Sequence, residues 1–277
     1  MKKIGLALGG GGVRGLAHAL VFEALDELGC RPCIITGTSM GAIMGALYAS
    51  GLPGKAIREN ILRNIISRQD TWRDILHKRS DIMKVVKTVT LDRGGSGLVK
   101  PDRFLNYLLS PIHKASFEEL DIPLVIIATD YWSGEEVAIK EGELLPALKA
   151  SMAIPGVFAP VSIGNRVLLD GGIVDLVPYE HILDQCDISI AVNVAGVRTP
   201  GKRRTPNILE SVLGSLQIMQ EATLSEKLKQ RRPDIMVHPE ITDVPILDFG
   251  KVARVLRQSA PAVEKMKRDI EKLLMAQ

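Results

Sequence analysis

Two glycine-rich turns lie near the start of the chain, and each stands between an apolar run and a segment with helical periodicity. The first turn covers residues 9–15 and follows the apolar run 3–8, and the second covers residues 37–41. Short apolar runs bounded by glycine are typical of buried strands, and residues 13–28 place apolar side chains at helical spacing, as do residues 42–51. The repeated order of strand, turn and helix predicts a parallel βαβ unit with a right-handed crossover.

The rest of the chain continues this alternation. Further strands are expected at residues 124–129, 136–139, 166–169, 188–194 and 234–238. Helices are expected over much of 53–120, broken by a glycine-rich loop at 93–97, over 208–229, and in a basic tail at 248–277, while loop 198–205 reads as solvated. We therefore predict one α/β domain over residues 1–277, with three α/β/α layers and a mainly parallel central sheet. Its sequence motifs lie within residues 1–180.

The composition excludes several classes of protein. Hydrophobic residues make up 46% and charged residues 24% of the 277, which suits a globular domain, and a net charge of +3 is too small to indicate nucleic-acid binding. Cys30 and Cys33 form a C-x-x-C pair with no second pair and no nearby histidine, so we expect reduced thiols and no metal. The apolar run after Met1 is too short for an export signal, and no segment is long enough to span a bilayer, which predicts a cytoplasmic protein.

The second turn reads Gly-Thr-Ser-Met-Gly and fits the pattern G-x-S-x-G around Ser39. A serine held between a strand and a helix needs a cramped backbone, and Gly37 and Gly41 remove the side chains that would clash there. This geometry exposes the hydroxyl and points the helix N-terminus at it. The turn predicts a serine acyl hydrolase with Ser39 as nucleophile.

The first turn contains G-x-G-x-x-G at Gly10, Gly12 and Gly15, which is also the pattern of dinucleotide-binding sites. A dinucleotide site requires an acidic residue at the end of the second strand to hold the ribose, and the residues there are Thr36 to Ser39. A phosphate-binding loop would need Gly-Lys-Ser/Thr, which does not follow. The remaining interpretation is a run of backbone N–H groups that stabilises the oxyanion of a tetrahedral intermediate.

The serine also needs a base. The histidines are His18, His77, His113, His181 and His238, and none stands in a distinctive local sequence. Asp170 is a stronger candidate, because it ends an apolar run and is followed by Gly171 and Gly172. A tight turn of this kind leaves the carboxylate with little cover from neighbouring side chains. A Ser-His-Asp arrangement stays an alternative at this point.

Four motifs occur in one order over roughly the first 180 residues: the glycine loop with Arg14, the turn around Ser39, the segment Ala-Ser-x-Ala-x-Pro-Gly-x-Phe-x-Pro at 150–160, and Asp-Gly-Gly at 170–172. Together they resemble the patatin-like phospholipase family of serine acyl hydrolases. The resemblance implies a Ser39–Asp170 dyad without histidine.

The same resemblance places the oxyanion hole at Gly10, Gly11 and Gly12. It gives Arg14 a role in positioning the loop or contacting a phosphate. It implies no metal and no cofactor.

The expected substrate is a phospholipid or another fatty acyl ester. Apolar residues near the motifs suit an acyl tail: Met44, Leu47, Met152, Ile154, Val157 and Phe158. The basic tail alternates with apolar residues, although Pro261 is expected to break its helix, and peripheral contact with an anionic membrane is one interpretation of it. The alternative function is a silent module of the same fold that binds lipid or a regulatory partner.

Overall fold

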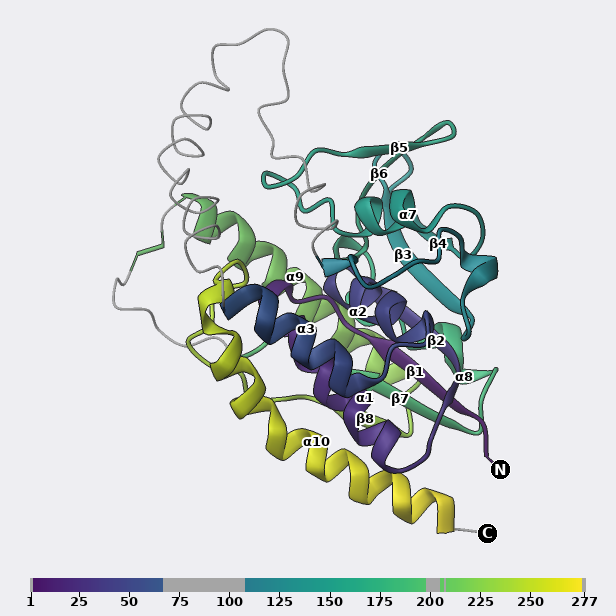
Figure 1. Ribbon diagram of the computed structural model, residues 1–277. Helices are drawn as coiled ribbons and strands as arrows, with labels where there is room; N and C mark the ends of the chain where they lie inside the picture. Colours follow the sequence, from purple (N-terminus) through teal and green to yellow (C-terminus); the bar gives the residue numbers. More distant parts are fainter. Residues whose placement is uncertain (1, 67–107, 198–204, 207, 276–277) are drawn as a thin grey trace, which may run out of the picture.

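The strands form a mixed sheet. The computed structural model describes residues 2–66, 108–197, 205–206 and 208–275. Within these ranges, eight strands form one sheet in the order β5-β6-β3-β2-β1-β7-β8, with β4 also paired to β3 (Figure 1). The strands are β1 (Ile4–Leu8), β2 (Pro32–Thr38), β3 (Leu124–Asp130), β4 (Glu136–Ile139), β5 (Val161–Ile163), β6 (Arg166–Asp170), β7 (Ile188–Val192) and β8 (Ile235–Val237).

The middle of the sheet is parallel and one side is antiparallel. β1 pairs in parallel with β2 and β7, and the parallel pairing extends to β3 and β8. β3 pairs antiparallel with β4 and β6, and β5 pairs antiparallel with β6. The parallel centre confirms the expected α/β class and brings the carboxyl ends of β1 and β2 to the same edge, where both glycine turns lie.

The helices cover both faces of the sheet. They are α1 (His18–Glu27), α2 (Met40–Ala49), α3 (Gly54–Ile66), α7 (Leu144–Ser151), α8 (Glu180–Leu183), α9 (Ile208–Gln230) and α10 (Val252–Met275), with short 3-10 turns η1 (Gly12–Ala17), η2 (Phe117–Glu119), η3 (Gly171–Ile173) and η4 (Phe249–Lys251). In Figure 1, α10 lies alongside α1, which also contacts α3, while α9 lies behind the sheet.

Side chains alternate between two apolar cores along β1. Leu6 and Leu8 join the core that contains residues of α1, α2 and α10, whereas Ala7 joins the core that contains Ile182 of α8 and Leu224 of α9. Because successive side chains of a strand point to opposite faces, these two cores identify the two helical layers. The predicted three-layer arrangement is confirmed.

Several details differ from the expectations. The helix expected from residue 13 starts as the turn η1, because the glycine loop continues into it, and β5 and α7 had not been predicted. Pro261 lies inside α10 and does not end it, since buried Ser259 and Val263 hold the helix on both sides. The glycine-rich loop 93–97 and residues 198–204 lie outside the described residues.

The basic tail packs as part of the domain. Val255, Val263, Met266 and Ile270 of α10 are buried, and Lys267 forms an ion pair with Glu27. The apolar side of α10 is therefore already used, so the predicted contact with an anionic membrane would rest on charge alone. Among the described helices, none combines the length and apolar character needed to cross a bilayer.

Candidate active site

Ser39 is the single residue between the end of β2 at Thr38 and the start of α2 at Met40. Its backbone has φ 54° and ψ −121°, and among the described residues only Ser39 and Asp243 have positive φ without being glycine. A non-glycine residue in this region stores strain, and such strain clusters at functional turns. The sequence motif and the backbone therefore agree on a nucleophile turn at Ser39.

The glycines on either side of Ser39 permit a close approach of backbones. A Cβ atom at Gly41 would run into the carbonyl oxygen of Leu8, and a Cβ atom at Gly37 would lie 2.7 Å from the backbone nitrogen of Ala42. In both cases the obstacle is backbone, which cannot rotate away. The start of α2 can thus pack directly against the end of β1.

Three side-chain hydrogen bonds hold the turn. Ser39 donates its backbone N–H to Ser151 Oγ at 2.8 Å, and Ser151 Oγ donates to the Ile127 carbonyl at 2.6 Å. Thr38 Oγ1 donates to the Asp175 carbonyl at 2.9 Å. Ser151 belongs to the segment 150–160 on which the family resemblance rests, but the sequence did not predict this role for it.

The register of the sheet brings Asp170 to Ser39. Thr38 pairs with Ile127 in the parallel ladder, and Asp170 pairs with Ala128 in the antiparallel ladder on the other side of β3. Ala128 follows Ile127 on β3, so Asp170 lies one residue further along the sheet than Thr38. This is the level of Ser39, which follows Thr38. Only 5% of Asp170 and 6% of Ser39 is exposed.

The environment of Asp170 makes it a stronger base than an exposed aspartate. Burial raises the pKa of its carboxyl from 3.8 to about 6, although hydrogen bonds from the Gly172 N–H and the Ser39 side chain lower it in part. The Gly172 N–H donates to Asp170 Oδ1 at 2.8 Å. A pKa near 6 keeps the carboxylate ionised at neutral pH and raises its affinity for a proton.

The glycine loop supplies the donors beside this pair. A Cβ atom at Gly10 would lie 3.3 Å from Cβ of Ser39, so the loop passes close to the nucleophile. The N–H of Gly10 already donates to the Leu176 carbonyl at 3.0 Å. Within the described ranges, the N–H groups of Gly11 and Gly12 have no acceptor, which leaves these two for an oxyanion.

Arg14 fastens the loop. Its Nε donates to the Val244 carbonyl at 3.0 Å, and its side chain lies against Gly196. Burial lowers the pKa of the Arg14 guanidinium, and the charge of Glu221 raises it. These contacts favour the loop-positioning role over contact with a phosphate.

The site opens into a pocket with a largely apolar wall. Its lining comprises Gly10, Gly11, Gly12, Arg14, Ser39, Ile154, Asp170, Leu176, Ala195, Leu213, Leu216, Gln217, Gln220 and Ile246. Many of these lining residues come from the part of the chain after residue 180, in which the sequence contained no motif that predicted a role in the site.

Of the six residues expected to face an acyl tail, Ile154 lines this pocket. Met44 and Leu47 instead lie in the core, because α2 is buried on every side, and Met152, which follows α7, lies in the same core.

The described histidines are not placed to act as a base. His18 is buried, its Nε2 pairs with the Gly9 carbonyl at 2.9 Å, and burial lowers its pKa to about 4. His181 pairs with Glu136 at 2.6 Å, which raises the pKa of His181, while partial burial lowers it. His113 and His238 are exposed, and His77 lies outside the described residues.

Comparison with known proteins gives a family. The sequence profile described as patatin-like phospholipase matches residues 6–183, which is more than half of the chain. The chain belongs to this family.

An uncharacterized NTE family protein of Mycobacterium tuberculosis is 32% identical over 208 residues, which cover 74% of this chain and 53% of that protein. Lysophospholipase NTE1 of Candida glabrata is 27% identical over 282 residues, which cover 94% of this chain and 16% of that protein.

A solved structure shares the fold of this chain. VipD from Legionella pneumophila superposes with a TM-score of 0.50 at 14% identity, covering 95% of this chain and 67% of that chain. At this identity the likeness concerns the fold alone. The chain spans about half the length of its mycobacterial relative and about a sixth of the length of the Candida glabrata protein. The activity of either whole protein is therefore not assigned to this chain.

Replacing Gly41 by alanine tests the close approach of α2 to β1. We expect Gly41→Ala to lower the free energy of unfolding by about 1–3 kcal/mol, because the new methyl group meets the Leu8 backbone. Gly45→Ala, on the same helix, is the control: its methyl group meets side-chain atoms at 3.1 Å or more. Urea denaturation of both variants decides, and equal stability would contradict the packing argument.

Replacing Asp170 by asparagine tests the cost of the buried charge. Because the pKa rises from 3.8 to about 6, ionisation of Asp170 costs the folded state roughly 3 kcal/mol above pH 6 and nothing below pH 4. We expect Asp170→Asn to be more stable than the wild type at pH 7.5, with the gain shrinking towards pH 4.5. Urea denaturation measures the difference in free energy of unfolding between the two proteins. A difference that does not vary with pH would show that ionising Asp170 does not destabilise the folded state.

Proposed function

We propose that the chain hydrolyses fatty acyl esters of phospholipids or lysophospholipids, with Ser39 as nucleophile and Asp170 as base. The observation that carries the proposal is the placement of both side chains in one buried pocket, with Gly11 and Gly12 beside them. Membership of the patatin-like phospholipase family supports the same class of reaction.

In the first half of the reaction, Ser39 Oγ attacks the carbonyl carbon of the ester. Asp170 accepts the hydroxyl proton, and the fixed contact between the two removes the cost of orienting them. Asp170 then returns this proton to the leaving alcohol, which is the head-group side of the lipid. The products of this step are a free alcohol and an acyl group on Ser39.

The negative charge of the tetrahedral intermediate needs donors that are already in place. The N–H groups of Gly11 and Gly12 have no acceptor within the described ranges, whereas that of Gly10 is used by Leu176. We assign the oxyanion hole to Gly11 and Gly12 and give Gly10 the role of holding the loop. Each such donor typically contributes a few kcal/mol to the transition state.

In the second half, water attacks the acyl group on Ser39. Asp170 takes a proton from this water as the bond forms, and the proton then passes to Ser39 Oγ as the fatty acid leaves. The residues of this chain account for every proton in both halves. The cycle calls on no metal and no cofactor.

The pocket wall supports an apolar acyl group as the bound part of the substrate. Ile154, Leu176, Leu213, Leu216 and Ile246 contribute side chains to it, and Arg14 is the positive group among the lining residues. Apolar walls with a few placed polar groups are typical of sites for lipids and other small molecules. The proposal therefore puts the acyl chain along α9.

Removal of either member of the dyad should abolish turnover. We expect Ser39→Ala to lower kcat/KM for p-nitrophenyl esters at least about a thousandfold, and Asp170→Asn at least about a hundredfold. Ser133→Ala and Asp184→Asn, which change exposed residues, are the matched controls and should keep full activity.

A fluorophosphonate probe should label the wild type and the controls but not Ser39→Ala. Turnover that persists in Ser39→Ala would refute the assignment, and a wild type that binds lipid vesicles without labelling would favour a silent binding module.

The pH profile should report the buried base. Asp170 must be ionised to accept a proton, and its pKa is about 6, so kcat/KM should rise with pH and level off above pH 7. Below pH 5 it should fall about tenfold per pH unit. Initial rates between pH 4.5 and 8 measure this, and a midpoint near 4 would contradict the buried environment of Asp170.

A further inference from the structure

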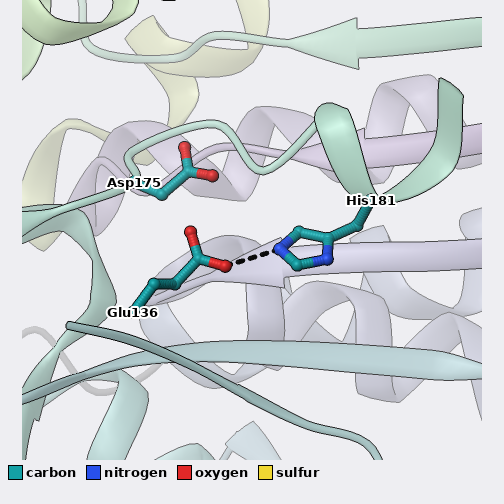
Figure 2. Close-up of side chains that lie close together, drawn as sticks. All are labelled: Glu136, Asp175 and His181. Atoms are coloured by element: carbon teal, nitrogen blue, oxygen red, sulfur yellow. Dashed lines mark hydrogen bonds and ion pairs between the residues drawn. The ribbon is translucent and has the colours of Figure 1, made fainter.

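Three potential metal ligands meet outside the pocket. Glu136 begins β4, Asp175 follows η3, and His181 lies on α8, and one ligand atom from each lies within 4.8 Å of the others (Figure 2). None of the three lines the pocket around Ser39. They come from separate elements, so the sequence pattern does not reveal the group.

The contacts within the group leave one oxygen unused. His181 Nε2 pairs with Glu136 Oε1 at 2.6 Å, and Lys227 Nζ pairs with Asp175 Oδ2 at 2.8 Å. Asp175 Oδ1 is buried and has no hydrogen-bond donor among the described residues, and the side chain at hydrogen-bond range of the Asp175 carboxyl is the Glu136 carboxylate, which is itself an acceptor. Only 2% of Asp175 is exposed, so water does not compensate this oxygen from outside.

The charges around this oxygen favour a cation. Figure 2 shows the Asp175 and Glu136 carboxylates facing one another with the His181 ring beside them. Two facing carboxylates repel, and a buried carboxylate oxygen without a partner is costly. Lys227 pairs with both Asp175 and Glu180, and His181 pairs with Glu136, so two basic side chains face three carboxylates.

We propose that Glu136, Asp175 and His181 bind one divalent transition-metal cation, with Zn²⁺ as the best fit. One imidazole and two carboxylates are ligands that Zn²⁺ accepts, whereas Ca²⁺ and Mg²⁺ prefer oxygen alone. Asp175 would bind through Oδ1 and keep Lys227 on Oδ2. Glu136 and His181 are both partly exposed and provide the way in from solvent.

The bound cation would stabilise the fold and would not take part in ester hydrolysis. The Asp175 carbonyl accepts from Thr38, next to Ser39, and the adjacent Leu176 carbonyl accepts from Gly10. A cation held by Asp175 would therefore tie β4 and α8 to the segment that holds both glycine turns. This makes it a structural cation, separate from the chemistry at Ser39.

Zn²⁺ titration of the EDTA-treated full chain tests the site. We expect isothermal titration calorimetry at pH 7.5 to give one Zn²⁺ per chain, and Glu136→Gln and His181→Ala each to weaken binding at least about tenfold. Glu135→Gln and His113→Ala, exposed residues of the same types, should bind Zn²⁺ like the wild type. Ca²⁺ and Mg²⁺ should bind far more weakly than Zn²⁺.

A second measurement separates binding from misfolding. Zn²⁺ should raise the Tm of the wild type and of both control variants, and should leave the Tm of His181→Ala unchanged. Circular dichroism without metal should be the same for all of these proteins. A wild type that takes up no Zn²⁺, or Zn²⁺ binding unchanged in either Glu136→Gln or His181→Ala, would overturn the proposal.

Discussion

The active site depends on the contact between the first turn of α2 and the end of β1. There is no room for a side chain at Gly41, because the carbonyl of Leu8 occupies that space. This contact sets the angle at which α2 leaves the sheet, and Ser39 takes the strained backbone that joins them. Since the glycine loop continues from β1, the same contact brings Gly10 beside Ser39. The proposed nucleophile and the proposed oxyanion donors thus depend on one packing constraint between neighbouring parallel strands.

The second requirement is a carboxylate that the fold buries at a cost to stability. Asp170 is held by its backbone, because its N–H donates to the Ala153 carbonyl and its carbonyl accepts from Thr129 Oγ1. These bonds keep the side chain beside Ser39 even though ionisation opposes burial. The extensive apolar cores on both faces of the sheet stabilise the fold and offset the cost of burying this charge.

Local patterns were enough to predict the fold class, the two turns and the strands β3 and β4, because each depends on residues close together in the chain. The elements that complete the site were not predictable in this way. Ser151 reaches Ser39 from a distant helix, and the Gly10 N–H is used by Leu176. Both depend on strand register, which residue types alone do not specify. Met44 and Leu47 were expected at the acyl wall for a related reason: the apolar periodicity of α2 describes a helix buried on all sides.

The pocket wall contributed by α9 lies beyond the region that the family profile matches, which ends at residue 183. Under the proposed function, the reacting groups and part of the pocket wall therefore belong to separate stretches of one chain. A protein built in this way can exchange the shape of its wall through substitutions at Leu213, Leu216 or Gln220 while the turn at Ser39 stays intact. That helix is therefore where a designer would begin to alter the proposed acyl preference.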